Sequence, residues 1–435
     1  MSRIAALLTA LALGAAACTT GVAQEPATPA TRATTTTTST TLPPTTTTTV
    51  PPTTTTTTVP VFDLAGSVTT PDGLPLPDAV VRISDAAVVT GADGLFLLTG
   101  VPAGTVTISR PAWHGTEVPW TGEARVDVTL EPRIVRALRV SSYVAADDDQ
   151  FSGLLDLADR TLVNALVFDT KDESGYVLYE TEVPEAAELG SVRPMYDVRA
   201  HLATAKERGL YTITRVVSFE DQVWTKADPS AKLAGRWIDA RNRDNWEYPL
   251  GLAVEACELG FDEIQFDYVR FPTGSAAVAA QAKSPTTQAE RLATIQGYLT
   301  EARTRLHPMG CAVSADIFGI VLSAPNDQGI GQRPEEVSEV VDAVSPMIYP
   351  SHYSEGWLGF EDPNDHPGPV TADALDDGNP RLTEPSLMRP WLQAFWWTNS
   401  QIRASIEEAE KRGVGWMLWN APGNYGESAL PSADG

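Results

Sequence analysis

The stretch FDEIQFDYVRFP, at positions 261–272, decides how the larger part of this chain is expected to fold. Apolar Ile264 and Phe266 alternate along it with polar side chains, the last of which is Asp267. Successive side chains of a β-strand point to opposite faces. The alternation therefore predicts a strand whose apolar face packs on helices and whose polar face carries Asp267 at its carboxyl end.

Seven other apolar stretches have strand character, and helix-like segments separate them. The eight predicted strands are 137–144, 163–169, 211–219, 263–271, 310–317, 343–349, 390–395 and 414–419, and predicted helices include 198–209, 249–260, 287–307, 333–341 and 400–413. Strands that alternate with helices indicate a parallel sheet with crossover helices. Eight such units within about three hundred residues fit an α/β fold of the (β/α)₈ or TIM-barrel type. An open doubly wound sheet is the alternative, although no glycine-rich nucleotide loop follows the first strand.

Three of these strands carry an aspartate at or near the carboxyl end, on the face predicted to point inward. They are Asp169, Asp267 and Asp316. A parallel barrel places its active site at the carboxyl ends of its strands, so the three carboxyl groups are expected to converge. Two carboxyl groups across a cavity are what glycosidic cleavage requires, one as proton donor and one as nucleophile or base. Asp169 and Asp316 have a structural alternative, as caps of the helices that follow.

Basic and aromatic residues lie near the same strand ends. Lys171, Arg215 and Arg270 are candidates for holding a carboxylate ionised or for binding substrate hydroxyls. Arg270 has a structural alternative, an ion pair with Asp267. The aromatic and imidazole candidates for contact with a sugar ring are Tyr349, His352, Tyr353, Trp396, Trp397, Trp419 and Tyr425. Packing within the core is the alternative for these rings.

The first eighteen residues are predicted to be a processing segment. Arg3 precedes an apolar run at 4–17, which is too short for a membrane span of roughly 20 residues and matches the core of a signal peptide. The run ends at Cys18 after small residues, and this junction resembles a bacterial lipobox. That resemblance implies lipidation of Cys18, although Ala15 stands where the motif prefers leucine. We therefore expect export and anchoring to the outer side of the cell membrane, with cleavage and secretion as the alternative.

Residues 19–60 are predicted to be an extended stalk, because threonine and proline leave almost no apolar side chain to bury. Residues 61–132 carry short strands, at 62–68, 79–83, 95–98 and 105–109, separated by glycine and proline turns. This spacing predicts a small all-β sandwich. Trp113 and Trp120 could stack on a sugar if exposed, but core packing is the expected state of each.

Charge and cysteine content limit the partners. The net charge of −25 disfavours nucleic acid and agrees with a neutral substrate. Cys257 and Cys311 could form a disulfide in an oxidising compartment, but their spacing alone does not establish one. The five histidines and three cysteines show no metal-ligand spacing, so neither a metal nor a cofactor is expected.

The β region is similar to the carboxypeptidase-regulatory-like domain, a prealbumin-like module. The segments that carry this likeness are GSV at 66–68, GLPLPDAVV at 73–81, DGLF at 93–96 and VPAG at 101–104. No peptidase chemistry follows from the likeness. The module is expected to space the next domain, with glycan binding as the alternative.

Residues 133–430 resemble a bacterial family of glycosyl-hydrolase-like barrels of the DUF4015 type. The likeness rests on ALVFDTKDESGYV at 165–177, FDEIQFDYVRFP at 261–272, SADIFGIV at 314–321, GIGQRPEEV at 329–337, VDAVSPMIYPSHY at 341–353, RPWLQAF at 389–395 and WMLWNAPGNY at 416–425. It implies a barrel related to retaining glycosidases with a catalytic aspartate at Asp267 and an acid partner at Asp316 or Asp169. The segment ARNRDNWEYP at 240–249 departs from the family pattern, which has a Trp-Val-x-Pro element there.

The functional expectation is hydrolysis of an extracellular polysaccharide or oligosaccharide. A non-catalytic glycan-binding or scaffolding lipoprotein is the main alternative. Hydrolysis of another polar bond with a metal is a weaker one, because ligand spacing is absent.

Overall fold

The computed structural model describes residues 59–122 and 125–433. The predicted signal segment, Cys18 and the predicted stalk up to residue 58 lie outside the described residues. Within the part of the chain that is described, no helix combines the length and apolarity that a membrane span requires.

The first seven strands form two sheets that share one core. One sheet has the order β4-β1-β7 and the other β3-β2-β5-β6. The strands are β1 (Val61–Thr69), β2 (Val80–Ile83), β3 (Ala86–Val89), β4 (Leu95–Pro102), β5 (Gly104–Ser109), β6 (Thr116–Trp120) and β7 (Val126–Thr129). Inward residues of both sheets, such as Leu64 and Ile108, belong to the same buried cluster. The predicted β-sandwich is therefore present.

Trp113 and Trp120 are both in this core, with exposed fractions of 5% and 6%. Neither indole presents a face to a ligand, so the packing alternative holds for both. The Asp93-Gly94 turn shows why glycine is needed there. Gly94 has φ +69°, and a Cβ at this position would lie 2.5 Å from the carbonyl oxygen of Val68.

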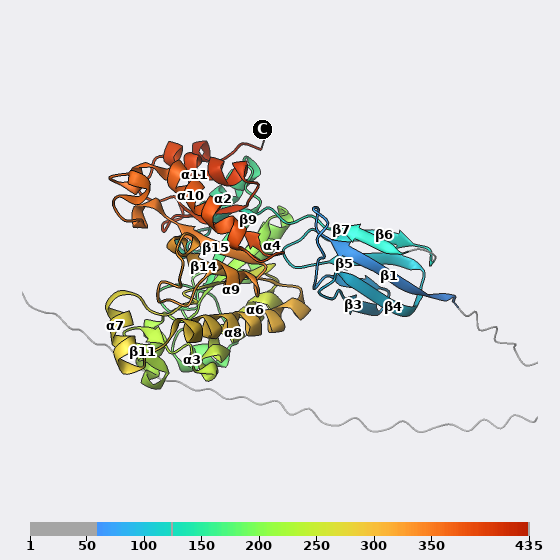
Figure 1. The fold of residues 1–435 in the computed structure, drawn as a ribbon, viewed down its shortest axis with the longest axis horizontal. Helices are drawn as coiled ribbons and strands as arrows, with labels where there is room; N and C mark the ends of the chain where they lie inside the picture. The colour runs from blue at the N-terminus through green and yellow to red at the C-terminus, as the bar shows by residue number, and fades with distance from the viewer. Residues whose placement is uncertain (1–58, 123–124, 434–435) are drawn as a thin grey trace, which may run out of the picture. The chain divides into compact units, whose positions relative to one another are not determined.

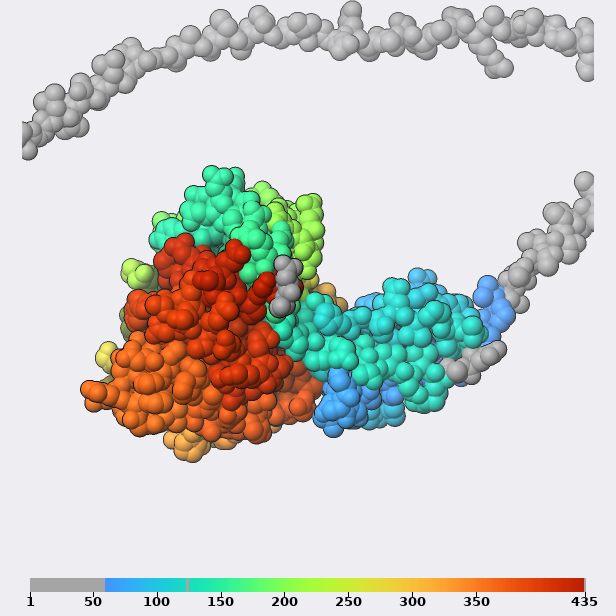
Figure 2. Space-filling view, turned by 90° about the horizontal axis from the view of Figure 1, so that it is seen from above, coloured from blue at the N-terminus to red at the C-terminus, as the bar shows by residue number. Residues whose placement is uncertain are grey.

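The remaining long strands form a closed parallel barrel (Figure 1), as the periodicity predicts. Around the barrel they run β14-β13-β10-β9-β8-β18-β17-β15, and β15 pairs with β14. The strands are β8 (Arg136–Arg139), β9 (Ala165–Lys171), β10 (Tyr211–Val217), β13 (Glu263–Asp267), β14 (Ala312–Phe318), β15 (Ala343–Ile348), β17 (Trp391–Gln393) and β18 (Trp416–Trp419). On the surface, Figure 2 shows teal and green segments beside the red C-terminal ones. Inside the barrel, β8 pairs with β18. The short β16 (Leu387–Met388) also pairs with β15, and β11 (Lys232–Ala234) pairs with β12 (Trp237–Ile238).

Side-chain alternation separates the inside of the barrel from its helix-covered outside. Ile264 and Phe266 of β13 pack in the large outer cluster with the helices. Ala165 and Val167 of β9 lie in a separate inner cluster that also contains Trp391 and Met417. The predicted assignment of apolar residues to the outer face of β13 is therefore confirmed.

The helices include all five that were predicted; three are one or two residues shorter than predicted, α9 is four shorter and α6 is one longer. These are α4 (Val198–Glu207), α6 (Glu247–Leu259), α8 (Gln288–Leu306), α9 (Pro334–Ser338) and α11 (Asn399–Lys411). The others are α1 (Ser142–Ala145), α2 (Asp148–Asp159), α3 (Pro184–Glu188), α5 (Gln222–Ala227), α7 (Gly274–Lys283) and α10 (Pro367–Gly378). Gly260 ends α6 in the left-handed conformation, at φ +109°, as expected of a glycine C-cap. A disulfide joins Cys257 on α6 to Cys311 just before β14, with their Cα atoms 6.0 Å apart.

Two predicted strands end four or five residues before their apolar stretches do. The stretch at 137–144 ends as a strand at Arg139, because the Ser141 hydroxyl accepts a hydrogen bond from the Val144 amide and begins α1. The stretch at 263–271 ends at Asp267, because Tyr268 adopts φ +49° and leaves the extended conformation. Both boundaries occur at the carboxyl edge of the barrel.

Candidate active site

A cavity of about 410 Å³ lies at the carboxyl ends of the barrel strands. Its walls come from the last residues of several strands and from the loops that follow them, which is where barrels of this type place their sites. It is lined by Glu173, Arg215, Asp267, Tyr268, Arg270, Asp316, Phe318, Gly319, Ile320, Met347, Tyr349, His352, Tyr353, Trp391 and Trp419. This set contains eight of the predicted residues: Asp267, Asp316, Arg215, Arg270, Tyr349, His352, Tyr353 and Trp419. It does not contain Asp169, Lys171, Trp396, Trp397 or Tyr425.

Asp267 is the last residue of β13, and both oxygens of its carboxyl group accept hydrogen bonds. Arg215 Nε donates to Oδ2 over 2.9 Å, and the Tyr268 amide donates to Oδ1 over 2.5 Å. A donor on each oxygen is the hydrogen-bonding pattern of a carboxylate. Tyr268 itself adopts a left-handed φ of +49°, which is rare for a bulky residue.

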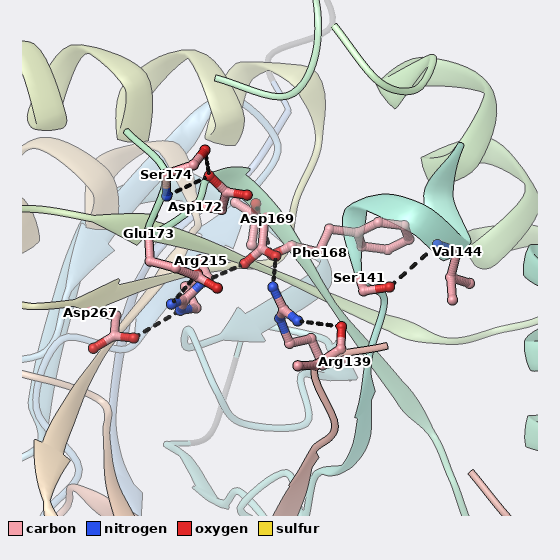
Figure 3. A network of polar contacts seen from close by, with 12 residues as sticks. Arg139, Ser141, Val144, Phe168, Asp169, Asp172, Glu173, Ser174, Arg215 and Asp267 are labelled. Atoms are coloured by element: carbon pink, nitrogen blue, oxygen red, sulfur yellow. Dashed lines mark hydrogen bonds and ion pairs between the residues drawn. The ribbon is translucent and has the colours of Figure 1, made fainter. Parts of the chain in front are cut away.

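Arg215 on β10 joins three carboxyl groups into one network (Figure 3). In addition to Asp267, it donates from Nη1 to Asp169 Oδ1 over 2.8 Å and from Nη2 to Glu173 Oε2 over 3.1 Å. The guanidinium is buried and lies 4.8 Å from the ring centre of Trp419. Burial lowers the pKa of Arg215, but the neighbouring carboxylates raise that pKa well above its usual value. The cation is therefore a permanent part of the site.

Asp169 lies in this network but outside the cavity wall. Its carboxylate accepts from Arg139 Nη2 over 2.5 Å and from Arg215 Nη1, and only 2% of the residue is exposed. It lies within β9 and caps no helix, so the capping alternative does not apply. The geometry gives Asp169 the task of fixing the position of Arg215.

Asp316 on β14 lies beside Asp267. Phe266 pairs with Ala315 across the two strands, so the residues that follow them, Asp267 and Asp316, are level and side by side. Trp391 Nε1 donates to Asp316 Oδ1 over 2.9 Å. Burial and the charge of Asp267 raise the pKa of Asp316 well above its usual value. This carboxyl group therefore keeps its proton at a higher pH than an ordinary aspartic acid does.

Glu173 is a cavity residue that the sequence patterns did not single out. It lies in the loop after β9, its side chain is 46% exposed, and it accepts from both terminal nitrogens of Arg215. Although burial opposes ionisation, the charges of Arg215 and Arg139 lower the pKa of Glu173 to about 2. Strand alternation ends before this position, so the only available signal was its place just after a predicted site strand.

Lys171 lies away from the cavity, contrary to its predicted substrate-binding role. Its ammonium group is fully buried and lies 2.8 Å from Asp221 Oδ2 and 2.8 Å from the carbonyl oxygen of Val217. The cause is a shift of register, in which Asp169 pairs with Arg215 but Lys171 pairs with the next residue, Val216. The extra residue in β9 turns the lysine to the opposite face.

Tyr425 is also outside the cavity wall. Its hydroxyl donates to the carbonyl oxygens of Arg139 and Leu418, 3.0 Å and 3.1 Å away. The tyrosine thereby ties the chain after β18 to strands β8 and β18. Tyr425 therefore has a structural role, and its position does not let it contact a ligand in the cavity.

Arg270, Tyr349 and His352 are in the wall as predicted. The Arg270 guanidinium lies 4.5 Å from the ring centre of Trp237 and 4.4 Å from that of Phe318. The ion pair with Asp267 is made by Arg215 instead. Tyr349 and His352 are in edge contact at 5.6 Å, and burial lowers the pKa of His352, which favours its neutral form. Among residues 59–122 and 125–433, no group of three or more potential ligands is arranged to hold a metal ion.

Adjacent carboxyl groups at the carboxyl ends of the strands of a closed barrel are an arrangement that glycoside hydrolases use. The model of the DUF4015 family, described as a putative glycosyl hydrolase domain, matches residues 137–425, and the chain belongs to this family. No curated protein sequence matches the chain significantly.

Several solved structures are similar to this chain. A hypothetical protein from Ruminiclostridium thermocellum ATCC 27405 is 34% identical over 41% of this chain and 96% of its own, with a TM-score of 0.37. The PgaB (BpsB) glycoside hydrolase domain from Bordetella bronchiseptica is 12% identical, covering 67% of this chain and 94% of its own, with a TM-score of 0.46. Chitobiase from Flavobacterium johnsoniae is 11% identical, covering 81% and 55%, also with a TM-score of 0.46.

Proposed function

We propose that this protein is a glycoside hydrolase that cleaves a polysaccharide, with Asp267 as nucleophile and Asp316 as acid and base. The observation that carries the proposal is the level placement of these two aspartates on adjacent strands in opposite environments. Asp267 has a hydrogen-bond donor on each oxygen, whereas burial beside Asp267 raises the pKa of the Asp316 carboxyl group. A raised pKa suits one carboxyl group of such a pair to the acid role and leaves the attacking role to the other.

The chemistry follows from these two states. An Asp267 oxygen attacks the anomeric carbon while Asp316 donates its proton to the leaving glycosidic oxygen, so the glycosidic bond breaks as a glycosyl ester forms. Water then attacks the same carbon and gives a proton to Asp316, which frees Asp267 and restores both groups. Arg215 and the Tyr268 amide hold the Asp267 carboxylate in place in both steps.

The strand geometry favours retention of configuration. Neighbouring strands are about 4.8 Å apart. Level side chains on one face are therefore close to the separation of about 5–5.5 Å found in retaining enzymes, and closer than the 6.5–9.5 Å or so of inverting ones.

The cellular setting is part of the proposal. The signal-like run at 4–17 and Cys18 support export and lipid anchoring, with secretion as the alternative. The disulfide between Cys257 and Cys311 agrees with an oxidising compartment. A polysaccharide outside the cell would then be the accessible substrate.

The test is incubation of the wild-type protein with a panel of polysaccharides, followed by measurement of new reducing ends and of binding. We expect release of reducing ends by the wild type, and binding without release by Asp267→Asn. Binding by the wild type with no release from any member of the panel would favour the alternative of a non-catalytic glycan-binding protein. Equal release of reducing ends by both proteins would show that Asp267 takes no part in the reaction.

A further inference from the structure

Trp396 is a large apolar side chain that the fold exposes. Its exposed fraction is 83%, and its backbone has φ +61°. The left-handed region is rare for a bulky aromatic residue, and such conformations persist where the surrounding structure imposes them. Single exposed apolar residues are common, so exposure alone carries no inference.

The turn that carries Trp396 is held on both sides. Before it, Gln393 Nε2 donates to the carbonyl oxygen of Phe395 over 3.2 Å, and Asn420 Nδ2 donates to that of Ala394 over 2.6 Å. After it, Trp397 Nε1 donates to Asn364 Oδ1 over 2.9 Å. The same Asn364 oxygen accepts from Gln393 Nε2, so one side-chain network holds both flanks. The outward direction of Trp396 is therefore built into the turn.

This turn is continuous with the wall of the active-site cavity. The Phe395 ring meets Trp396 edge to face at 4.9 Å, and it packs against Tyr349 at 5.5 Å and His352 at 6.2 Å. Tyr349 and His352 line the cavity. Trp396 is thus the exposed end of an aromatic row that begins in the cavity.

We propose that Trp396 is an outer sugar-binding platform, which holds a neutral polysaccharide chain where it leaves the cavity. The inference rests on the proposed function and specifies its substrate as a chain longer than the cavity itself. An indole face offers apolar contact to the C–H face of a pyranose ring, and a rigid aromatic side chain does so at a small entropy cost. The net charge of −25 disfavours an anionic chain.

The test is affinity gel electrophoresis of the full chain with Asp267→Asn, which prevents cleavage, in gels that contain glycol chitin, hydroxyethylcellulose, laminarin or pullulan. We expect retardation by at least one polymer, and a Kd about tenfold weaker when Trp396→Ala is added, as for the loss of one aromatic contact. Trp396→Tyr retains a ring and should keep most of the affinity. Leu358→Ala is the matched control, because Leu358 is also exposed, at 47%, and has φ +54°.

Equal binding with and without the Trp396 ring would overturn the inference, as would the absence of retardation by all four polymers. Release of reducing ends by the wild type is scored separately. Hydrolysis that is unaffected by Trp396→Ala contradicts the platform and leaves the proposed function intact. Trp396-dependent binding without hydrolysis contradicts the proposed function and leaves the platform intact.

Discussion

Arg215 Nε donates to Asp267 Oδ2 over 2.9 Å, and the same guanidinium also holds Asp169 and Glu173. One buried cation thus fixes the proposed nucleophile relative to two other carboxylates. Asp316 lies beside Asp267 and accepts its hydrogen bond from a different donor, Trp391 Nε1, over 2.9 Å. The site thus combines an anchored carboxyl group, Asp267, with a neighbour, Asp316, whose pKa is raised.

Asp316→Asn should impair the cleavage of natural glycans far more than that of activated substrates. A leaving group that needs no protonation bypasses the acid, whereas a sugar leaving group does not. We expect a loss of about 10²–10⁴-fold in kcat/KM on the polysaccharide. The loss on a 2,4-dinitrophenyl glycoside should be much smaller, as measured by initial rates on both substrates. Equal losses on the two would remove Asp316 from the acid role.

Asp316→Asn should also stabilise the protein at neutral pH. Burial and the Asp267 charge raise the pKa of Asp316 in the folded state, so the folded protein binds this proton more tightly than the unfolded chain does. The wild type therefore loses stability as the pH rises from the unfolded pKa of about 3.9 toward the folded pKa. The Asp316→Asn variant has no such group and does not lose this stability. We expect an advantage of about 1–2 kcal/mol for the variant at pH 7 that shrinks toward pH 4. Urea unfolding at the two pH values measures it, and an advantage that grows toward pH 4 would contradict the assignment.

Lys171→Met should destabilise the fold. The substitution leaves the Asp221 carboxylate buried and unpaired, because Lys171 Nζ is 2.8 Å from Asp221 Oδ2 and both side chains are fully buried. We expect a loss of about 3–5 kcal/mol in the free energy of unfolding, and recovery of much of it when Asp221→Asn is added. Polysaccharide binding by the double variant should be unchanged, because Lys171 is outside the cavity. Two results would contradict this structural role and support substrate binding by Lys171. One is an unchanged free energy of unfolding for Lys171→Met, and the other is weaker polysaccharide binding by a stable double variant.

The barrel was predictable because its strands follow a simple periodicity. In β13 and β14, apolar side chains face the helices, and the same alternation places Asp267 and Asp316 at the inner rim. Helix ends such as Gly260 were marked by glycine in the expected place. These features depend on residue type and spacing alone.

The rest of the site depended on departures from regularity. The extra residue in β9 turned Lys171 outward, and the left-handed Tyr268 ended β13 early. Lys171 and Tyr268 are not glycines, so residue type did not mark either the register shift or the left-handed turn. Glu173 was missed because it lies in a loop, where no period applies. The pairing of Asp169 with Arg139 connects strands β9 and β8, and strand register is not readable from one sequence.

The most direct test of the central claim is the kcat/KM of Asp267→Asn on a cleaved polysaccharide, compared with that of Asp172→Asn. Asp172 lies in the loop after β9, next to Glu173 and outside the cavity wall, and it accepts a hydrogen bond from the Ser174 amide, so it controls for the loss of one carboxyl group near the site. We predict a loss of about a thousandfold or more for Asp267→Asn and an almost unchanged value for Asp172→Asn. Retention of wild-type turnover by a folded Asp267→Asn protein would contradict the account.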